Sequence, residues 1–133
     1  MEKNSDIQFR SPEEIKLYQE ARLTETLAYL QAHSRFYQQM FKEHSIDITR
    51  IKKIEDLQQI PVTTKTDLQL HNSEFICVDP DGIIDYVTTS GTLGDPVTFV
   101  LTSKDLDRLA YNEYLSFNTA GCSRHDILQL MTT

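Results

Sequence analysis

The sequence predicts an α/β protein in which N-terminal helices precede a β-hairpin, a further helix and a final strand. Three observations support this class. A capped helix pattern begins at Ser11; two runs rich in β-branched and aromatic residues, 83–89 and 96–102, flank a short glycine-containing loop; and another capped helix pattern follows the second run. The 133 residues, 39% of them hydrophobic, suffice for one modest domain. We expect residues 1–60 to be helical and residues 61–133 to be α/β.

The first helix is predicted to start at Ser11, because its hydroxyl can cap the helix, Pro12 suits the first helical position and Glu14 completes a capping box. Ser34 is predicted to cap a second, shorter helix in the same way. The apolar face of the first helix comprises Ile15, Tyr18, Leu23, Leu27 and Leu30. The second helix carries an apolar stripe of Phe36, Tyr37, Met40 and Phe41, which we interpret as core packing.

The middle of the chain predicts a connection and then a short helix. Residues 45–60 mix isoleucines with charges and stop at Pro61, so we expect a surface connection with one helical turn over 55–59. Thr64, with Asp67 three residues later, predicts a short helix that extends to residue 70 or 71.

The C-terminal part predicts a longer helix and a strand. Thr102 and Asp105 form another capping pattern, and the helix should end near Gly121. A strand is expected to begin at Ile127. Its unpaired apolar surface favours self-association, so a homo-oligomer is one expectation. The inner face of the helix is predicted to hold Leu106, Ala110, Tyr114 and Phe117, with Tyr111 and Tyr114 packing against other residues rather than contacting a nucleotide base.

Composition and charge exclude several classes of function. Twenty acidic against thirteen basic residues give a net charge of -7, which disfavours binding to nucleic acid or to an anionic membrane. No run of about 18 apolar residues and no apolar signal-peptide core is present, so a cytoplasmic protein is expected. Cys77 and Cys122 lack zinc-ligand spacing and predict free thiols. The four histidines are scattered and predict no metal site.

The stretch "TTSGTLGDP", residues 88–96, is the strongest candidate for a binding site. Its glycines leave the main chain accessible, and its hydroxyls and successive N–H groups can form a concavity that binds an anion. Composition alone favours an ordinary hairpin turn, with phosphate binding as the alternative. Neither GxxxxGK followed by Ser or Thr nor GxGxxG is present, and the absence of GxSxG excludes a hydrolase nucleophile. The candidate phosphate-binding residues are Thr88, Thr89, Ser90, Gly91, Thr92 and Gly94.

This stretch resembles the phosphate loop of the adenylate-forming (AMP-binding) ligases, and its surroundings resemble one branch of them, the phenylacetate–coenzyme A ligases. Three further segments carry the closer resemblance, which spans about residues 12 to 131. They are "SRFYQQMFKEHSID", "IEDLQQIPVTTKTDL" and "LTSKDLDRLAYNEYLSFNTAGCSRHDIL". Two positions depart from the pattern: Leu93 replaces a threonine, and Asp95 stands where a lysine is common. Both changes predict weaker affinity for nucleotide.

The resemblance implies an enzyme that uses ATP and magnesium to adenylate a carboxylic acid, and then transfers the acyl group to coenzyme A. The loop would hold the phosphates of ATP. The chain would be the opening part of the large N-terminal domain, a single incomplete segment with no catalytic residue of its own. Such a fragment would be inactive alone. The alternative is a non-catalytic module, derived from such a ligase, that binds nucleotide or another protein.

Overall fold

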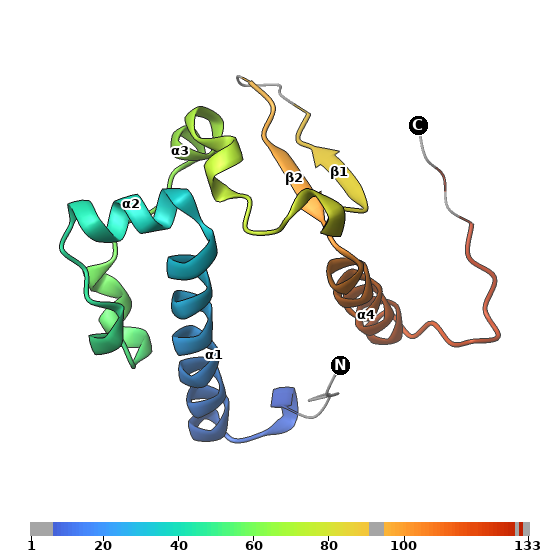
Figure 1. Cartoon of the computed structure of the whole chain (residues 1–133). Helices are drawn as coiled ribbons and strands as arrows, with labels where there is room; N and C mark the ends of the chain where they lie inside the picture. Colours follow the sequence, from blue (N-terminus) through green and yellow to red (C-terminus); the bar gives the residue numbers. More distant parts are fainter. Residues whose placement is uncertain (1–6, 91–94, 130, 132–133) are drawn as a thin grey trace. The chain divides into compact units, whose positions relative to one another are not determined.

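The computed structural model of the chain describes residues 7–90, 95–129 and 131, and the candidate loop residues 91–94 lie outside this description (Figure 1). Helices come first, followed by a two-stranded sheet and a last helix, as the sequence predicts. The elements in chain order are η1 (Ile7–Phe9), α1 (Pro12–His33), α2 (Arg35–Glu43), η2 (Ile48–Arg50), η3 (Ile54–Gln59), α3 (Lys65–Leu70), η4 (Asn72–Phe75), η5 (Pro80–Gly82), β1 (Asp85–Thr88), β2 (Thr98–Leu101) and α4 (Ser103–Thr119), where η marks a 3-10 helix.

The described residues form two compact units. The first unit combines residues 1–78 with residues 88–98, so it contains the helices η1 to η4 and the ends of the candidate loop. The second unit combines residues 79–87 with residues 99–133 and contains α4. The boundary at residue 60 that the sequence suggests coincides with neither unit and stays a prediction.

All four described α-helices begin at the caps that the sequence predicts. Ser11, Thr64 and Thr102 each accept a hydrogen bond from the backbone N–H three residues on, and the acidic side chain there accepts one from the cap backbone. Ser34 caps α2 by accepting from the N–H of Tyr37. None of the described helices combines the length and the apolar character needed to cross a membrane.

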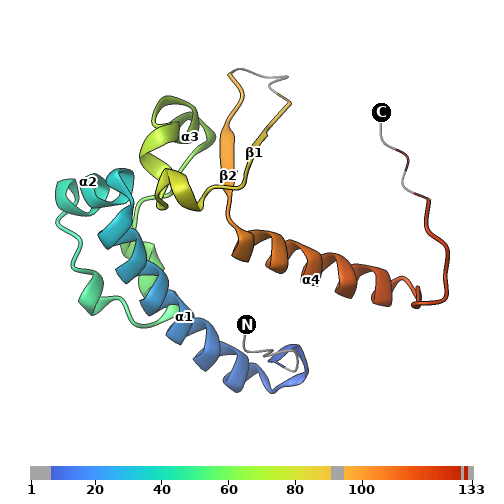
Figure 2. The ribbon, with the colours of Figure 1, turned by 45° about the vertical axis from the view of Figure 1, so that its right-hand side comes forward.

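The core of the first unit is built from three buried side chains, Leu27 of α1, Phe41 of α2 and Ile51. Only 1% of Ile51 is exposed, although it belongs to the stretch predicted to be a surface connection. That stretch contains the predicted helical turn within η3, but it also lies against α1 (Figures 1 and 2). The surface prediction was therefore wrong at this isoleucine, because η2 and η3 both contact α1. The partly buried residues around this core are Leu23, Tyr37, Ile46, Ile48 and Ile60.

Strands β1 and β2 pair as the predicted hairpin, and β2 leads directly into α4 (Figure 2). At the open end the N–H of Ile84 donates to the carbonyl of Leu101 over 2.9 Å. At the loop end the N–H of Thr89 donates to the carbonyl of Val97 over 3.0 Å. The bond between Thr89 and Val97 closes the hairpin beside the candidate loop.

Helix α4 ends as predicted but does not bury its predicted face. Gly121 has φ +86°, which a glycine adopts without strain, and the N–H of Cys122 returns to the carbonyl of Phe117. No residue of α4 is buried, and Tyr114 is 54% exposed. The periodicity marks an apolar face correctly, but no described element of the second unit covers it. The predicted inner-face residues that remain exposed are Leu106, Ala110, Tyr114 and Phe117.

The predicted final strand is absent from the described residues. Residues 127–129 do not form a strand, and Ile127 is 99% exposed. A strand requires backbone hydrogen bonds to a neighbour, and the described part of the chain offers this segment none. The apolar pattern therefore did not suffice to form a strand. Cys77 and Cys122 are free thiols, both half-buried, as expected.

Candidate phosphate-binding site

The structure places three of the six predicted phosphate-binding residues at the end of β1. Thr88 is the last residue of the strand, Thr89 and Ser90 follow it, and all three are exposed. The predicted residues Gly91, Thr92 and Gly94, and the departure at Leu93, lie outside the described residues. These three residues are therefore accessible from solvent, although the hydroxyl oxygen of Thr89 also has a partner within the hairpin.

Thr89 closes the base of the loop with two hydrogen bonds to one residue. Its N–H donates to the carbonyl of Val97, and its hydroxyl oxygen accepts from the N–H of Val97, both over 3.0 Å. Only 2% of Val97 is exposed, so this closure is shielded from water. A threonine hydroxyl also carries one donor hydrogen, which this arrangement leaves available. Thr89 can hold the loop and donate to an anion at the same time.

The returning arm of the loop, residues 95–98, is tied to the segment of α3 and η4. The Nε2 of Gln69 donates to the carbonyl of Asp95 over 2.6 Å. The amide of Asn72 donates to the carbonyl of Thr98 over 2.9 Å and accepts from its N–H over 3.0 Å. Sequence reasoning missed both amides, because each partner lies 26 residues away and leaves no local signal.

The α3–η4 segment is itself fixed to the helices before it. The hydroxyl of Ser34, fully buried between α1 and α2, donates to the carbonyl of Glu74 over 3.1 Å. The rings of Phe36 and Phe75 stack with their centroids 4.0 Å apart. The hydroxyl of Tyr29 donates to the carbonyl of Cys77 over 3.0 Å. The returning arm, residues 95–98, is therefore attached to a part of the first unit that is itself packed against α1 and α2.

The charges around the loop differ from those of a lysine-based phosphate site. Residues 88–96 contain no lysine or arginine, and the single charged side chain, Asp95, is exposed. Phosphate binding here has to rest on N–H and hydroxyl donors. At the base of α3 the hydroxyl and N–H of Thr64 hold the pKa of Asp67 below its ordinary value, so that carboxylate keeps its charge as a helix cap.

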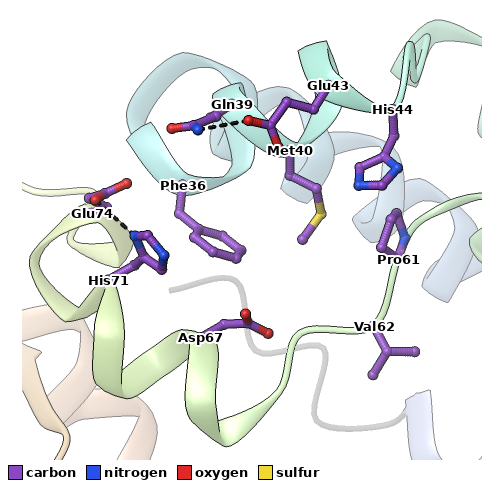
Figure 3. A pocket seen from close by; sticks show the side chains of 10 residues that line it. All are labelled: Phe36, Gln39, Met40, Glu43, His44, Pro61, Val62, Asp67, His71 and Glu74. Carbon is purple, nitrogen blue, oxygen red and sulfur yellow. Dashed lines mark hydrogen bonds and ion pairs between the residues drawn. The ribbon is translucent and has the colours of Figure 1, made fainter.

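A hollow of about 270 Å³ lies between α2 and α3, and its chemistry opposes phosphate (Figure 3). Figure 3 shows Phe36 and Met40 pointing from α2 towards Asp67. Three carboxylates and no lysine or arginine line the hollow. Each carboxylate has a structural partner, since Glu43 accepts from Gln39, Glu74 lies 3.0 Å from the Nδ1 of His71, and Asp67 caps α3. The lining residues are Phe36, Gln39, Met40, Glu43, His44, Pro61, Val62, Asp67, His71 and Glu74.

A metal centre is likewise not assembled by the described side chains. Across residues 7–90, 95–129 and 131, no three His, Cys, Asp or Glu residues come close enough together to hold an ion.

Comparison with solved structures shows which class of protein has this fold. A crystal structure of 2-hydroxyisobutyryl-CoA ligase in complex with 2-HIB-AMP and CoA matches 81% of this chain with a TM-score of 0.74 and 25% identity. The same ligase in the postadenylation state matches 70% of the chain with a TM-score of 0.63 and 26% identity. The fold of the described chain is thus that of the N-terminal part of an adenylate-forming ligase.

Similar sequences then show which branch of the adenylate-forming ligases this chain resembles. A phenylacetate–coenzyme A ligase of Thermus thermophilus is 32% identical over 110 residues, which are 82% of this chain and 25% of that protein. A phenylacetate–coenzyme A ligase of Escherichia coli is 29% identical over 122 residues, 90% of this chain and 28% of that protein. The resemblance found in the sequence is confirmed, and the chain is phenylacetate–coenzyme A ligase-like. No family model matches it.

The chain is short relative to all of these proteins. It spans about a quarter of the length of the curated relatives and 24% of the ligase structure bound to 2-HIB-AMP and CoA.

Proposed function

We propose that this chain supplies the phosphate-binding loop of an ATP-dependent acyl–coenzyme A ligase. The observation that carries the proposal is a hydroxyl-rich loop held at the tip of a hairpin, in a sequence similar to phenylacetate–coenzyme A ligases. In the proposed reaction a carboxylate attacks the α-phosphorus of ATP, and negative charge develops on the departing pyrophosphate. Fixed donors around that charge lower the barrier. The proposed donors are Thr88, Thr89, Ser90, Gly91, Thr92 and Gly94.

The chain alone is proposed to bind nucleotide weakly and to complete no reaction. Much of the rate acceleration in such a transfer comes from holding both reactants in position, and one loop cannot position an acid and coenzyme A as well. ATP, magnesium and coenzyme A are proposed as the cofactors of the larger enzyme, and a carboxylic acid of aryl-acetate type as its substrate. Because the proposed reaction uses ATP and coenzyme A, we propose a cytoplasmic location for the protein.

Calorimetry with ATP and magnesium tests the loop directly. We expect the wild-type chain to bind at millimolar nucleotide, and Ser90→Ala and Thr92→Ala each to weaken that binding. Ser116→Ala and Thr119→Ala, the same chemical changes on exposed positions of α4, should leave it unchanged. Absence of binding by the wild-type chain at millimolar nucleotide, or equal losses in the control pair, would overturn the phosphate assignment.

A second candidate is a non-catalytic interaction module derived from such a ligase. Two features favour it: the acidic Asp95 in the loop, and exposed apolar side chains on the hairpin and α4, such as Tyr86 at 63% and Tyr114 at 54% exposure. Sheet edges and apolar faces of this kind associate with other chains, including a second copy. Sedimentation over a range of concentrations tests self-association, and a monomer at every concentration would remove the homo-oligomer from the proposal.

A further inference from the structure

We infer that Asn72, assisted by Gln69, is the positioning residue that holds residues 95–98, the returning arm that follows the proposed phosphate-binding residues. The inference rests on the proposed function of the loop and adds to it the side chains that hold its returning arm. The geometry that points to this role is a set of three side-chain hydrogen bonds between the α3–η4 segment and residues 95–98.

The amide of Asn72 pairs with Thr98 as a neighbouring strand would. It donates to the carbonyl of Thr98 over 2.9 Å and accepts from the N–H of the same residue over 3.0 Å. Residues opposite each other in an antiparallel ladder exchange the same two bonds. Because both bonds reach one residue, they fix the rotation of that backbone as well as its distance. Only a side chain with a donor and an acceptor side by side can make both.

Gln69 adds a second point of attachment at the other end of the arm. Its Nε2 lies 2.6 Å from the carbonyl of Asp95, directly after the loop residues. Between these two points Val97 is held by Thr89 from the incoming arm. The returning arm is thus held from one side by α3 and η4 and from the other by the start of the loop.

The anchoring amides lie on a segment that is itself held by hydrogen bonds to the helices before it. The capping box of Thr64 and Asp67 fixes the start of α3, and the hydroxyls of Tyr37 and Thr63 lie 3.1 Å apart just before it. Buried Ser34 holds η4 through Glu74. Preorganised donors stabilise developing charge better than donors that must first be ordered. A returning arm held in one position would therefore help to lower the barrier of the proposed reaction.

The clamp, which is the set of three hydrogen bonds from Asn72 and Gln69 to residues 95–98, is formed by side chains outside the main hydrophobic cluster of the same unit. The core consists of Leu27, Phe41 and Ile51 with their apolar neighbours, and neither Asn72 nor Gln69 belongs to it. Loss of the clamp should therefore free the loop while the helices stay folded. This separation allows a test in which loop order and overall stability are measured independently.

The decisive variant is Asn72→Asp, which has nearly the same shape. It keeps an acceptor for the N–H of Thr98 but replaces the donor with a second acceptor that faces the Thr98 carbonyl. We expect amide hydrogen exchange at Thr98 and Val97 to be about tenfold faster at neutral pH, as loss of a half-buried hydrogen bond predicts, with exchange at Leu27 and Phe41 unchanged. Asn112→Asp, the same change at an exposed position of α4, should have no effect.

Acid should rescue this variant specifically. A protonated carboxyl again offers one O–H donor beside one acceptor, so below about pH 4 the two-point pairing can re-form. The protection of Thr98 in Asn72→Asp, divided by that of the wild type at the same pH, should rise towards one as the pH falls. Asn72→Ala, which lacks both groups, should show no such recovery. Equal exchange in wild type and Asn72→Asp at neutral pH, or no acid recovery, would overturn the inference.

A titration with ATP and magnesium, followed by the amide signals of Thr89 and Ser90, adds the functional readout. We expect weaker binding by Asn72→Asp and by Gln69→Glu at neutral pH, with wild-type affinity in Asn112→Asp. Unchanged affinity in both clamp variants would overturn the positioning role even if exchange changes. Failure of the wild type to bind would instead overturn the proposed phosphate function, and the exchange data would still decide whether Asn72 holds the arm.

Discussion

Replacement of Thr89 by valine should open the base of the loop. The substitution keeps the β-branched shape and exchanges the hydroxyl for a methyl group. In the structure that hydroxyl accepts from the N–H of Val97 over 3.0 Å, and Val97 is only 2% exposed. A buried N–H left without a partner costs about 1–3 kcal/mol. The opening equilibrium at Val97 should therefore shift by about 5- to 150-fold, since each 1.4 kcal/mol corresponds to about a factor of ten.

Hydrogen exchange at the Val97 amide measures this opening directly. Thr88→Val serves as the matched control, because it makes the same change one residue earlier on an exposed side chain. Thr89→Ser retains the hydroxyl and should keep most of the protection. We expect fast exchange in Thr89→Val alone, with the N–H of Thr89 still protected in part by its own bond to the carbonyl of Val97.

The same series separates the structural and the ligand-binding roles of the hydroxyl. If the free O–H of Thr89 donates to phosphate, ATP affinity should fall in Thr89→Val and persist in Thr89→Ser. Slow, wild-type exchange at Val97 in Thr89→Val would refute the closure derived from the structure. Equal acceleration in Thr88→Val would attribute the effect to the methyl group and not to the lost bond.

Two further predictions concern the platform beneath the loop. Ser34→Ala removes the cap of α2 and the buried donor to η4, and should lower the free energy of unfolding by about 2 kcal/mol in urea denaturation, whereas exposed Ser116→Ala should change it little. The folded-state pKa of Asp67 is lowered by Thr64, so its stabilisation is present above the ordinary carboxyl pKa and is lost as the pH falls through the folded value. Acid titration by circular dichroism should show a smaller stability loss in Asp67→Asn than in Asp107→Asn or the wild type.

The features that sequence analysis predicted well are those with local causes. A helix cap and its partner lie three residues apart, so Ser11, Thr64 and Thr102 could be recognised from adjacent letters, and the structure has all three capping boxes. The hairpin was likewise visible from β-branched runs on both sides of a glycine-containing stretch. In each case the physical interaction that forms the element lies within the window that the pattern covers.

The features that were missed depend on distant partners. Ile51 is buried because η2 and η3 lie against α1, a contact that its charged neighbours in the sequence do not indicate. Asn72 gains its role from Thr98, 26 residues away. The predictions of a buried face on α4 and of a strand over the described residues 127–129 were wrong for the same reason. A periodic pattern states that a surface is apolar, but it does not state what covers it.

The candidate loop shows how a structural and a functional interpretation can hold for the same residue. From composition, a hairpin turn and a phosphate site were alternatives. In the structure Thr89 closes the hairpin with its backbone and with one lone pair of its hydroxyl, and its O–H hydrogen stays available. A loop that must present ordered donors needs a closed base, so the bonds that make it a good turn are also those that would make it a good phosphate site. Evidence for the turn therefore does not count against phosphate binding.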